Sequence, residues 1–453
     1  MFNIVDILES DALRIQALLE GQRLDFKSFR ITPAKLSQSL SALANTDGGE
    51  IYVGVEDDRK WAGFQNIEAT NGISSMIFDM FPVQDYVNCE FLSASNRDGI
   101  VLKIEVFRTP DVVRSTSGDP YKRFGAQNRK LTSSDSIRQL EYTKGVHSYE
   151  DIFLNDSLID VVNSASIVEF CMNIAPYPEP LAWLKKQKLT DGERASVAAY
   201  VLFSDEPQVL LPKSGIKVYR YKTTEDEGTR DTLAFNPISI EGSAIELIKS
   251  AVQVTKEKVQ EIPKIGDAGL EAVVYPEDAI HEILTNAVLH RDYSANDEVH
   301  IRIFDNRIEV FSPGKLPGYV TPRNILKERF ARNPKIVRIA NKFPNAPNKD
   351  VGEGLNTAFE RMRELKLRDP VISETDAGVT VTLFHELLAS PEKLVEDYLK
   401  ENGEINNSRG REICREGSEN KMKRIFDRMI KAGIIERIPD RYGKATAYRL
   451  KQS

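Results

Sequence analysis

The pair Glu282 and Asn286 is the part of the sequence whose residue types and spacing most directly suggest chemistry. The two residues are four positions apart in a segment of helical periodicity, so both side chains leave one helix face. An asparagine oxygen can ligate Mg²⁺ on a triphosphate, and a glutamate one turn earlier can act as base for an attacking water. Downstream, Gly352 and Gly354 let backbone N–H groups approach phosphates. The alternative is that the pair is helix polarity and the glycines are caps.

Acidic residues near the N-terminus form a second group that could do chemistry. Glu20 and Asp25 lie in LLEGQRLDFKSF, and Glu56 and Asp57 follow the apolar run IYVGV. Carboxylates that converge from different segments suit Mg²⁺ or Mn²⁺, and two such ions can activate water and hold a leaving oxygen. The alternative is that Glu20 ends a helix, Asp25 begins a strand and the later acidic run is a solvated turn.

The elements around these carboxylates predict an α+β domain over residues 1–148. Residues 10–20 predict a helix with Ser10 as N-cap, and Thr32-Pro33 opens a second helix. That helix ends at the turn signal Asn45–Gly49, after which a buried strand is expected. Residues 149–265 are expected to form a connecting α/β domain, in which no motif indicates chemistry.

Glu282 and Asn286 belong to a second α+β unit, expected over residues 266–388. Residues 276–292 predict one amphipathic helix with an apolar side. Residues 299–311 then predict a hairpin across the turn Asp305-Asn306. Glycine loops, another helix and a closing strand complete the unit.

The net charge of −7 hides an uneven distribution. The 453 residues hold 61 Lys and Arg against 68 Asp and Glu. Residues 408–453 hold 13 Lys and Arg against six Asp and Glu, a charge of +7, so the other 407 residues carry −14. A basic segment on an acidic body favours a nucleic-acid contact at that end of the chain.

This basic segment lies in a predicted winged helix-turn-helix domain over residues 389–453, with three helices and a two-stranded hairpin. Ser418–Arg428 would be the recognition helix, with Ile425, Met429 and Ile430 facing the core. The alternative is a winged helix used for dimerisation or protein contact. The residues expected to reach bases or phosphates are Asn420, Lys421, Lys423, Arg424, Arg428, Arg441 and Lys444.

Composition limits the class of protein. Hydrophobic residues make up 41% and charged residues 28%, which is typical of a folded water-soluble protein of two to four domains. No apolar run approaches the roughly 20 residues of a membrane span, and the N-terminus lacks a signal-peptide pattern. The three cysteines are far apart, so we expect a reducing, cytoplasmic location and no membrane partner.

The N-terminal motifs resemble the Schlafen AlbA-like domain over about residues 10–145. The matching elements are the acidic-Phe-Lys segment, Asn45–Gly49, the acidic end of the strand IYVGV, and Tyr121–Gly125. The resemblance implies either RNA cleavage by three carboxylates with a divalent metal, or DNA binding. Glu20 and Asp25 match the first two acidic positions and Glu56 or Asp57 the third, although glutamate is usual where Asp25 stands. A cationic loop is expected to meet phosphates or to be plain soluble surface, through Lys122, Arg123, Arg129 and Lys130.

Four ordered motifs resemble the ATPase-like domain of bacterial Schlafen-domain regulators, which is similar to a RecG helicase C-terminus. They are Asn286–Tyr293, Ser312–Pro317, Arg332–Pro334 and Gly352–Leu355. The resemblance implies a GHKL-like α/β sandwich that binds ATP with Mg²⁺ or Mn²⁺, with Asn286 as metal ligand and Glu282 as base.

The base-reading element departs from the GHKL pattern. That superfamily usually reads adenine with the aspartate of a D-x-G-x-G element, where this chain has Ser312-Pro313-Gly314, and Asp305 lies earlier across the hairpin. Gly314 would let the base or ribose lie against the backbone. The sequence contains no Walker A motif and no helicase motif set.

Three functional hypotheses follow for this α+β multidomain chain. The first is an ATP-binding, DNA-binding regulator, transcriptional or defence-related, that works as a homodimer or higher homo-oligomer. The second is a Schlafen-like metal-dependent endoribonuclease gated by ATP, in phage defence. The third is a non-catalytic interaction scaffold. DNA is the favoured nucleic acid, RNA is the alternative, and ATP hydrolysis stays open.

Overall fold

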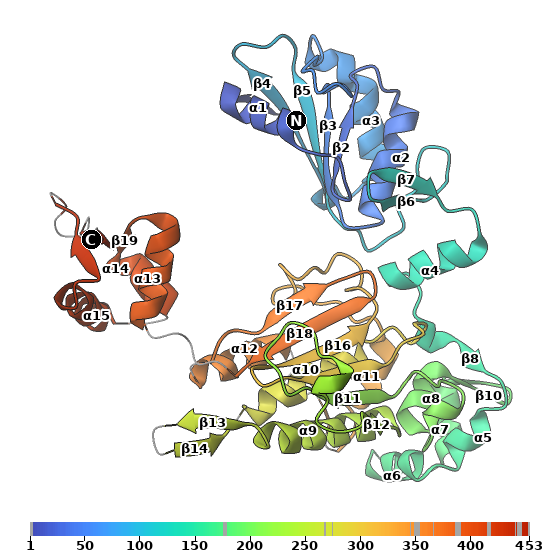
Figure 1. Cartoon of the computed structure of the whole chain (residues 1–453). Helices are drawn as coiled ribbons and strands as arrows, with labels where there is room; N and C mark the ends of the chain where they lie inside the picture. The colour runs from blue at the N-terminus through green and yellow to red at the C-terminus, as the bar shows by residue number, and fades with distance from the viewer. Residues whose placement is uncertain are drawn as a thin grey trace.

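The chain folds into an N-terminal lobe (residues 3–144), a central lobe (149–385) and a C-terminal lobe (391–451), as Figure 1 shows for this computed structural model. The structure describes residues 3–174, 179–266, 269–273, 275–344, 346–347, 354–365, 367–385, 391–414, 418–439, 441 and 446–451. None of the helices in these ranges is both long and apolar enough to cross a membrane.

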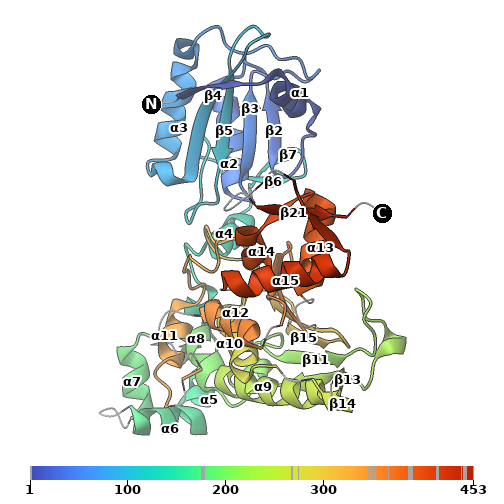
Figure 2. The same cartoon turned by 90° about the vertical axis from the view of Figure 1, so that its left-hand side faces the viewer.

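The N-terminal lobe is built on a five-stranded sheet in the order β1-β4-β5-β3-β2, whose strands lie side by side in Figure 2. Strands β1 and β4 are parallel, as are β2 and β3, and the other pairs are antiparallel. The strands are β1 (Asn3–Ile7), β2 (Leu24–Lys27), β3 (Gly49–Val53), β4 (Val87–Ala94) and β5 (Val101–Val106). The helices are α1 (Glu9–Ala17), α2 (Pro33–Ala44), α3 (Asn71–Met80) and α4 (Ser134–Lys144), and β6 (Tyr121–Phe124) and β7 (Gln127–Lys130) form a hairpin.

The two predicted helix starts in this lobe have different outcomes. Thr32 caps α2 as predicted, since its side chain accepts from the N–H of Lys35 at 3.4 Å and Pro33 occupies the first turn. The predicted cap at Ser10 is wrong: the helix begins at Glu9, and Leu8, two residues before Ser10, stands at the cap position. It ends at Ala17, so Glu20 lies beyond the helix.

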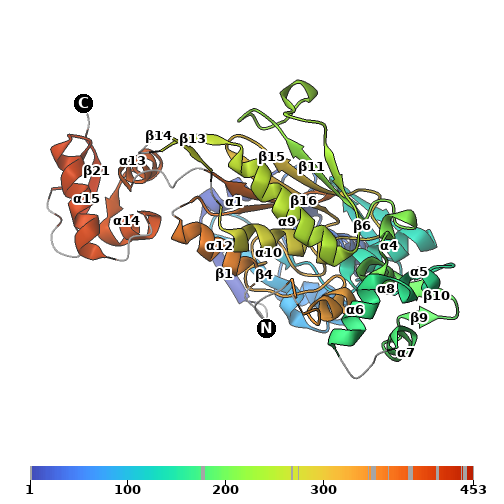
Figure 3. The same cartoon turned by 90° about the horizontal axis from the view of Figure 1, so that it is seen from below.

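The central lobe contains a six-stranded sheet in the order β12-β11-β15-β16-β18-β17. Helices α9, α10 and α12 pack together over one face of it, and Figure 3 shows α9 in front of β15 and β16. The strands are β11 (Ile216–Arg220), β12 (Ile238–Ile240), β15 (Val299–Ile303), β16 (Arg307–Pro313), β17 (Val371–Glu374) and β18 (Gly378–Phe384). The three helices are α9 (Ala244–Gln260), α10 (Glu277–Leu289) and α12 (Gly354–Glu364).

The predicted boundary at residue 265 does not separate two cores. Strands β11 and β12 come from the expected connecting domain, yet β11 pairs in parallel with β15 in the same sheet. One continuous apolar core runs from Val161 to Leu383. The remaining elements of the lobe are α5 (Leu158–Val162), α6 (Ala165–Asn173), α7 (Pro180–Lys186), α8 (Val197–Phe203), α11 (Pro334–Ala340), β8 (Phe153–Leu154), β9 (Thr190–Asp191), β10 (Arg194–Ser196), β13 (Pro263–Gly266) and β14 (Gly269–Ala272).

The C-terminal lobe has its own core and a three-stranded sheet in the order β19-β21-β20. The prediction that Ile430 faces this core is wrong, because its side chain is 38% exposed, whereas Met422 and Phe426 are fully buried beside Ile425 and Met429. The elements are α13 (Pro391–Asn402), α14 (Asn407–Cys414), α15 (Glu419–Lys431), β19 (Ile405–Asn406), β20 (Ile435–Arg437) and β21 (Ala447–Leu450).

Candidate functional site

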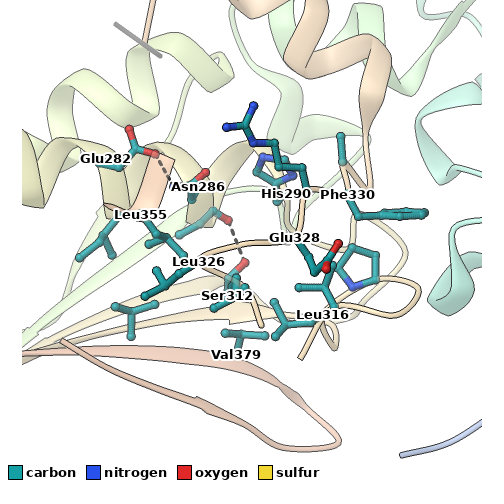
Figure 4. A pocket seen from close by; sticks show the side chains of 18 of the residues that line it. Glu282, Asn286, His290, Ser312, Leu316, Leu326, Glu328, Phe330, Leu355 and Val379 are labelled. Atoms are coloured by element: carbon teal, nitrogen blue, oxygen red, sulfur yellow. Dashed lines mark hydrogen bonds between the residues drawn. The ribbon is translucent and has the colours of Figure 1, made fainter. Parts of the chain in front are cut away.

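Helix α10 places Glu282 and Asn286 on the rim of a cavity. Its apolar residues, among them Ile283 and Ala287, are buried against the sheet and the neighbouring helices. Glu282 and Asn286 are half-buried, and the Asn286 Nδ2 donates to Glu282 Oε1 at 2.7 Å. The predicted i, i+4 pair is therefore formed, and Figure 4 shows both side chains over the cavity.

The cavity lies between α10, strands β16 and β18, and the loop that follows β16. Its volume is about 500 Å³, within the range of pockets that bind small molecules. Most of the wall is apolar. Its polar and charged lining residues are Glu282, Asn286, His290, Ser312, Lys315, Glu328, Arg329, Asn341 and Asn356.

Ser312 and Gly314 lie in the wall of the cavity, at the end of β16 and directly after it. The Ser312 hydroxyl donates to the Ala287 carbonyl at 2.8 Å, which ties the strand to α10. Gly314 has φ +93°, and a Cβ there would lie 2.5 Å from the Asp292 Cβ. Only glycine allows this close approach of the loop to the end of α10.

Asp305 does not belong to the cavity, which corrects the prediction that it binds the cofactor. It lies at the turn between β15 and β16 and forms an ion pair with Arg220. Strand β16 runs from Arg307 to Pro313, so the turn is about 20 Å from the Ser312 end of the strand. Gly352 lies outside the described residues, and Gly354 begins α12, whose Leu355 and Asn356 line the cavity.

The residues that follow α10 form an internal brace. Arg291, nearly fully buried, donates to the backbone carbonyl of Asp297 at 2.8 Å, and Asp292 contacts Arg332 at 3.4 Å. Asn333 donates to the carbonyls of Leu289 and Arg291 at 2.9 and 2.8 Å. The H-R-D and R-N-P motifs therefore hold the end of α10 in place.

His290 faces the cavity as a neutral imidazole. Its burial, reinforced by the Arg332 guanidinium, lowers its pKa to about 4. At neutral pH the side chain can therefore donate or accept one hydrogen bond without adding a charge to the cavity.

The loop between the S-P-G and R-N-P motifs supplies much of the wall and was missed by the sequence analysis. Val320, Leu326 and Phe330 all line the cavity. These residues follow neither helical nor strand periodicity, so no pattern assigns them to one surface. Their only signal is a concentration of large apolar side chains in a loop between two motifs.

The four N-terminal carboxylates do not form a joint site. Asp25 is 1% exposed and its Oδ1 contacts Lys27 at 2.7 Å and Arg123 at 3.2 Å. Glu20 accepts from the N–H of Phe26 at 2.8 Å, and Glu56 accepts from Ser28 at 2.9 Å. Asp57 is exposed on the turn after β3.

This donor set does not suit the two-metal nuclease that the Schlafen resemblance implied. Within the described ranges, no group of three or more His, Cys, Asp or Glu side chains is placed to hold a metal ion. The inward carboxylate of Asp25 is already neutralised by cationic side chains of the protein. We therefore derive no cleavage step from these residues.

Arg123 is a second correction, because its guanidinium is buried and cannot meet phosphate. It donates to the carbonyls of Gly21 and Leu24 at 3.1 and 2.9 Å, and to Asn128 Oδ1 at 2.7 Å. Lys122 is half-buried, and burial together with Lys315 lowers its pKa.

The exposed cations of the same hairpin are Arg129 and Lys130. Arg129 lies 5.3 Å from the Phe124 ring centroid, and Lys130 pairs with Asp119 at 2.7 Å. The cationic loop predicted from the sequence is thus reduced to these two exposed side chains.

Helix α15 presents the predicted polar face to solvent. Asn420, Lys421, Lys423, Arg424 and Arg428 are all exposed, opposite the buried apolar side. Lys423 pairs with Glu419 at 2.8 Å and Arg428 with Glu392 at 2.7 Å. Arg441 is exposed and contacts Glu404 at 2.8 Å, and Lys444 lies outside the described residues.

Two segments of the chain match known family models. Residues 20–132 match the family described as Schlafen, AlbA_2, and residues 296–383 match that described as Putative ATP-dependent DNA helicase recG C-terminal. These matches confirm the domain type predicted for each segment. The second match begins after α10, so the assignment of Glu282 and Asn286 depends on motif and geometry.

Whole-chain similarity is found among solved structures. No curated protein matches the chain. The crystal structure of the DIP2311 protein from Corynebacterium diphtheriae matches with 17% sequence identity and a TM-score of 0.43, over 95% of each chain.

Proposed function

We propose that the chain binds ATP in the central-lobe cavity and binds nucleic acid, with DNA favoured, through its outer lobes. It would act as a cytoplasmic regulator, transcriptional or defence-related. The observation that carries the proposal is the Glu282–Asn286 pair facing a cavity of about 500 Å³. The turn at Gly314 forms part of its wall. The matches to a Schlafen domain and an ATPase-like domain support it.

The residues around the cavity suit a nucleotide with its metal. Because the Asn286 Nδ2 donates to Glu282, the amide oxygen of Asn286 and the carboxylate of Glu282 lie at the same rim of the cavity. Oxygen donors of this kind suit Mg²⁺, which binds proteins through one or two side chains and keeps phosphate ligands. Mg²⁺ bound there would neutralise charge on the triphosphate.

The protein's own side chains would then perform distinct tasks. Glu282 would accept the proton of an attacking water, and Gly314 would leave room for the base or ribose. The apolar wall, including Leu326 and Val379, would exclude water from the bound base. Since Ser312 stands where an aspartate usually reads adenine, we expect weaker base selectivity than in GHKL proteins.

Replacing Asn286 by alanine tests the nucleotide site. We expect the affinity for a fluorescent ATP analogue with Mg²⁺ to fall about tenfold to a hundredfold, because a metal ligand and the anchor of Glu282 are lost together. The control is Asn306→Ala, at the β15–β16 turn away from the cavity. Equal affinities of the two variants would show that the site assignment is wrong.

The C-terminal lobe supplies the DNA-binding half of the proposal. Its three helices and small sheet suit a winged helix with α15 as the recognition helix. Five exposed polar residues on one side of α15 and four buried apolar residues on the other support this orientation. The homodimer expected from the sequence stays a prediction.

A further inference from the structure

Arg108 joins the N-terminal and central lobes through a buried, fully used guanidinium. Its side chain is 4% exposed, and it follows strand β5. On its own lobe it donates to Asp47 at 3.0 Å and to the Thr46 carbonyl at 3.1 Å. Across the junction it donates to both carboxylate oxygens of Glu374 at 2.8 and 3.1 Å, and to the Val320 carbonyl at 2.9 Å. These five bonds use all five N–H groups.

The partners of Arg108 on the central lobe are tied to the cavity wall. Val320 lines the cavity, and so does Leu316, whose N–H donates to Glu374 at 2.7 Å. Lys315, also in the wall, contacts Asp47 at 3.2 Å. The segment Lys315–Val320 of the cavity wall is therefore fastened to the N-terminal lobe at both ends. We call Asp47, Arg108, Lys315, Val320 and Glu374 the interdomain junction.

A second connection runs from the cavity wall through α4. The Phe330 ring packs on Gly145, where a Cβ would lie 2.5 Å from two ring carbons. The preceding Lys144 is buried, and its ammonium donates to the Ala44 carbonyl and to Thr109. Ala44 is the last residue of α2, immediately before the loop Asn45–Gly49.

That loop organises the hairpin that carries the exposed cations of the N-terminal lobe. The Asn45 amide donates to the Val113 and Tyr121 carbonyls at 2.7 and 3.0 Å. The Thr46 hydroxyl accepts from the N–H of Arg123 at 2.9 Å. A shift of the loop would therefore move β6 and β7, which present Arg129 and Lys130.

The Asp47 carboxylate of the interdomain junction is held in its charged form by the cations beside it. Burial by itself would raise the pKa of Asp47, but Lys315, Gln22 and Arg108 outweigh it and lower the pKa to about 2. The carboxylate therefore stays charged at neutral pH. Since the paired groups are shielded from solvent, salt screens them weakly, and breaking the two-pronged contact between Arg108 and Glu374 would leave both charges buried without their main partner.

We propose that nucleotide binding in the cavity is transmitted through the interdomain junction to the loop Asn45–Gly49, so that the N-terminal lobe responds to nucleotide. The inference rests on the proposed ATP site. A ligand that orders Lys315–Val320 favours the state in which Arg108 bridges the lobes, because only that state holds both ends of the segment. By linkage, nucleic acid bound to the N-terminal lobe changes the ATP affinity by the same factor.

Hydrogen exchange of the full chain, with and without ATP and Mg²⁺, tests the proposal. The reporter amides are those of Asn45, Thr46, Gly48 and Glu50, each hydrogen-bonded to a backbone carbonyl. In the wild type we expect ATP to slow exchange both in segment 315–320 and at these reporters, by about fivefold or more. In Arg108→Met we expect protection of the segment alone. The matched control is Arg14→Met, at an exposed position of α1.

Three outcomes overturn different parts of the account. If ATP protects neither region in the wild type, the proposed ATP site fails and the inference falls with it. If ATP protects the cavity segment but leaves the reporters unchanged, nucleotide binding stands and the transmission is wrong. If the reporters stay protected in Arg108→Met, the signal does not pass through Arg108.

A second variant keeps the test decisive if Arg108→Met does not fold. Arg108→Lys retains the buried positive charge, but a lysine cannot form the two-pronged contact with Glu374 while bonding Asp47 and Val320. We expect this variant to bind ATP and to lose the reporter response. A wild-type response in Arg108→Lys would contradict the bridging role.

Discussion

Replacing Arg123 by leucine is expected to lower the free energy of unfolding of the N-terminal lobe by about 3–5 kcal/mol. Arg123 is fully buried and bonds two backbone carbonyls, Asn128 and the carboxylate of Asp25. Leucine would leave these acceptors buried, with Asp25 retaining only Lys27 as its cationic partner. Urea unfolding of the wild type and of Arg123→Leu, monitored by hydrogen exchange in strands β2 and β3, measures the loss of unfolding free energy.

The control for this variant is Arg129→Leu in the same hairpin. Arg129 is exposed, and its side chain lies over the face of the Phe124 ring. We expect its loss to cost less than about 1 kcal/mol. Similar unfolding midpoints for both leucine variants would contradict the structural role of Arg123.

The result also bears on the nuclease hypothesis. Because Asp25 and Arg123 support each other in the core, variants of either residue disturb folding before they report on cleavage. The informative nuclease variants are therefore Glu56→Gln and Asp57→Asn, which lie at or near the surface.

Reversing two charges on α15 is expected to give the largest loss of DNA affinity. In Lys421→Glu/Arg424→Glu we expect binding at low salt to weaken about a hundredfold or more, with a salt slope smaller by about 2. Both side chains are exposed on the face opposite Met422 and Phe426, so the fold should tolerate the change. Fluorescence anisotropy with duplex DNA at several salt concentrations gives affinity and slope together.

The matched control has the same charge change elsewhere. Lys185→Glu/Lys186→Glu alters two exposed lysines at the end of α7 in the central lobe. If both double variants lose DNA affinity equally, the effect is one of net charge, and α15 is not the reading helix. If neither loses affinity, the C-terminal lobe serves another contact.

The helices that carry the proposed sites were largely predictable because their apolar residues repeat with helical spacing. In α10 the predicted apolar side is buried and leaves Glu282 and Asn286 at the cavity. In α15 the buried stripe consists of Met422, Ile425, Phe426 and Met429, and Ile430 lies outside it and is exposed.

What the sequence did not predict depends on contacts between distant segments. Arg123 looks like a surface cation in a polar hairpin, and only the fold places Asp25 beside it. Asp305 lies close to Ser312 along the chain, but an extended strand carries it to the far end of the sheet. The bridge from Arg108 to Glu374 joins residues that are 266 positions apart, a distance that no local pattern covers.

The most direct test of the account is a crystal structure of the full chain with a non-hydrolysable ATP analogue and Mg²⁺. The account predicts ligand density between α10 and strands β16 and β18, with the metal beside Asn286 and the nucleotide against Gly314. An empty cavity at saturating analogue, or density at another place in the molecule, would contradict it.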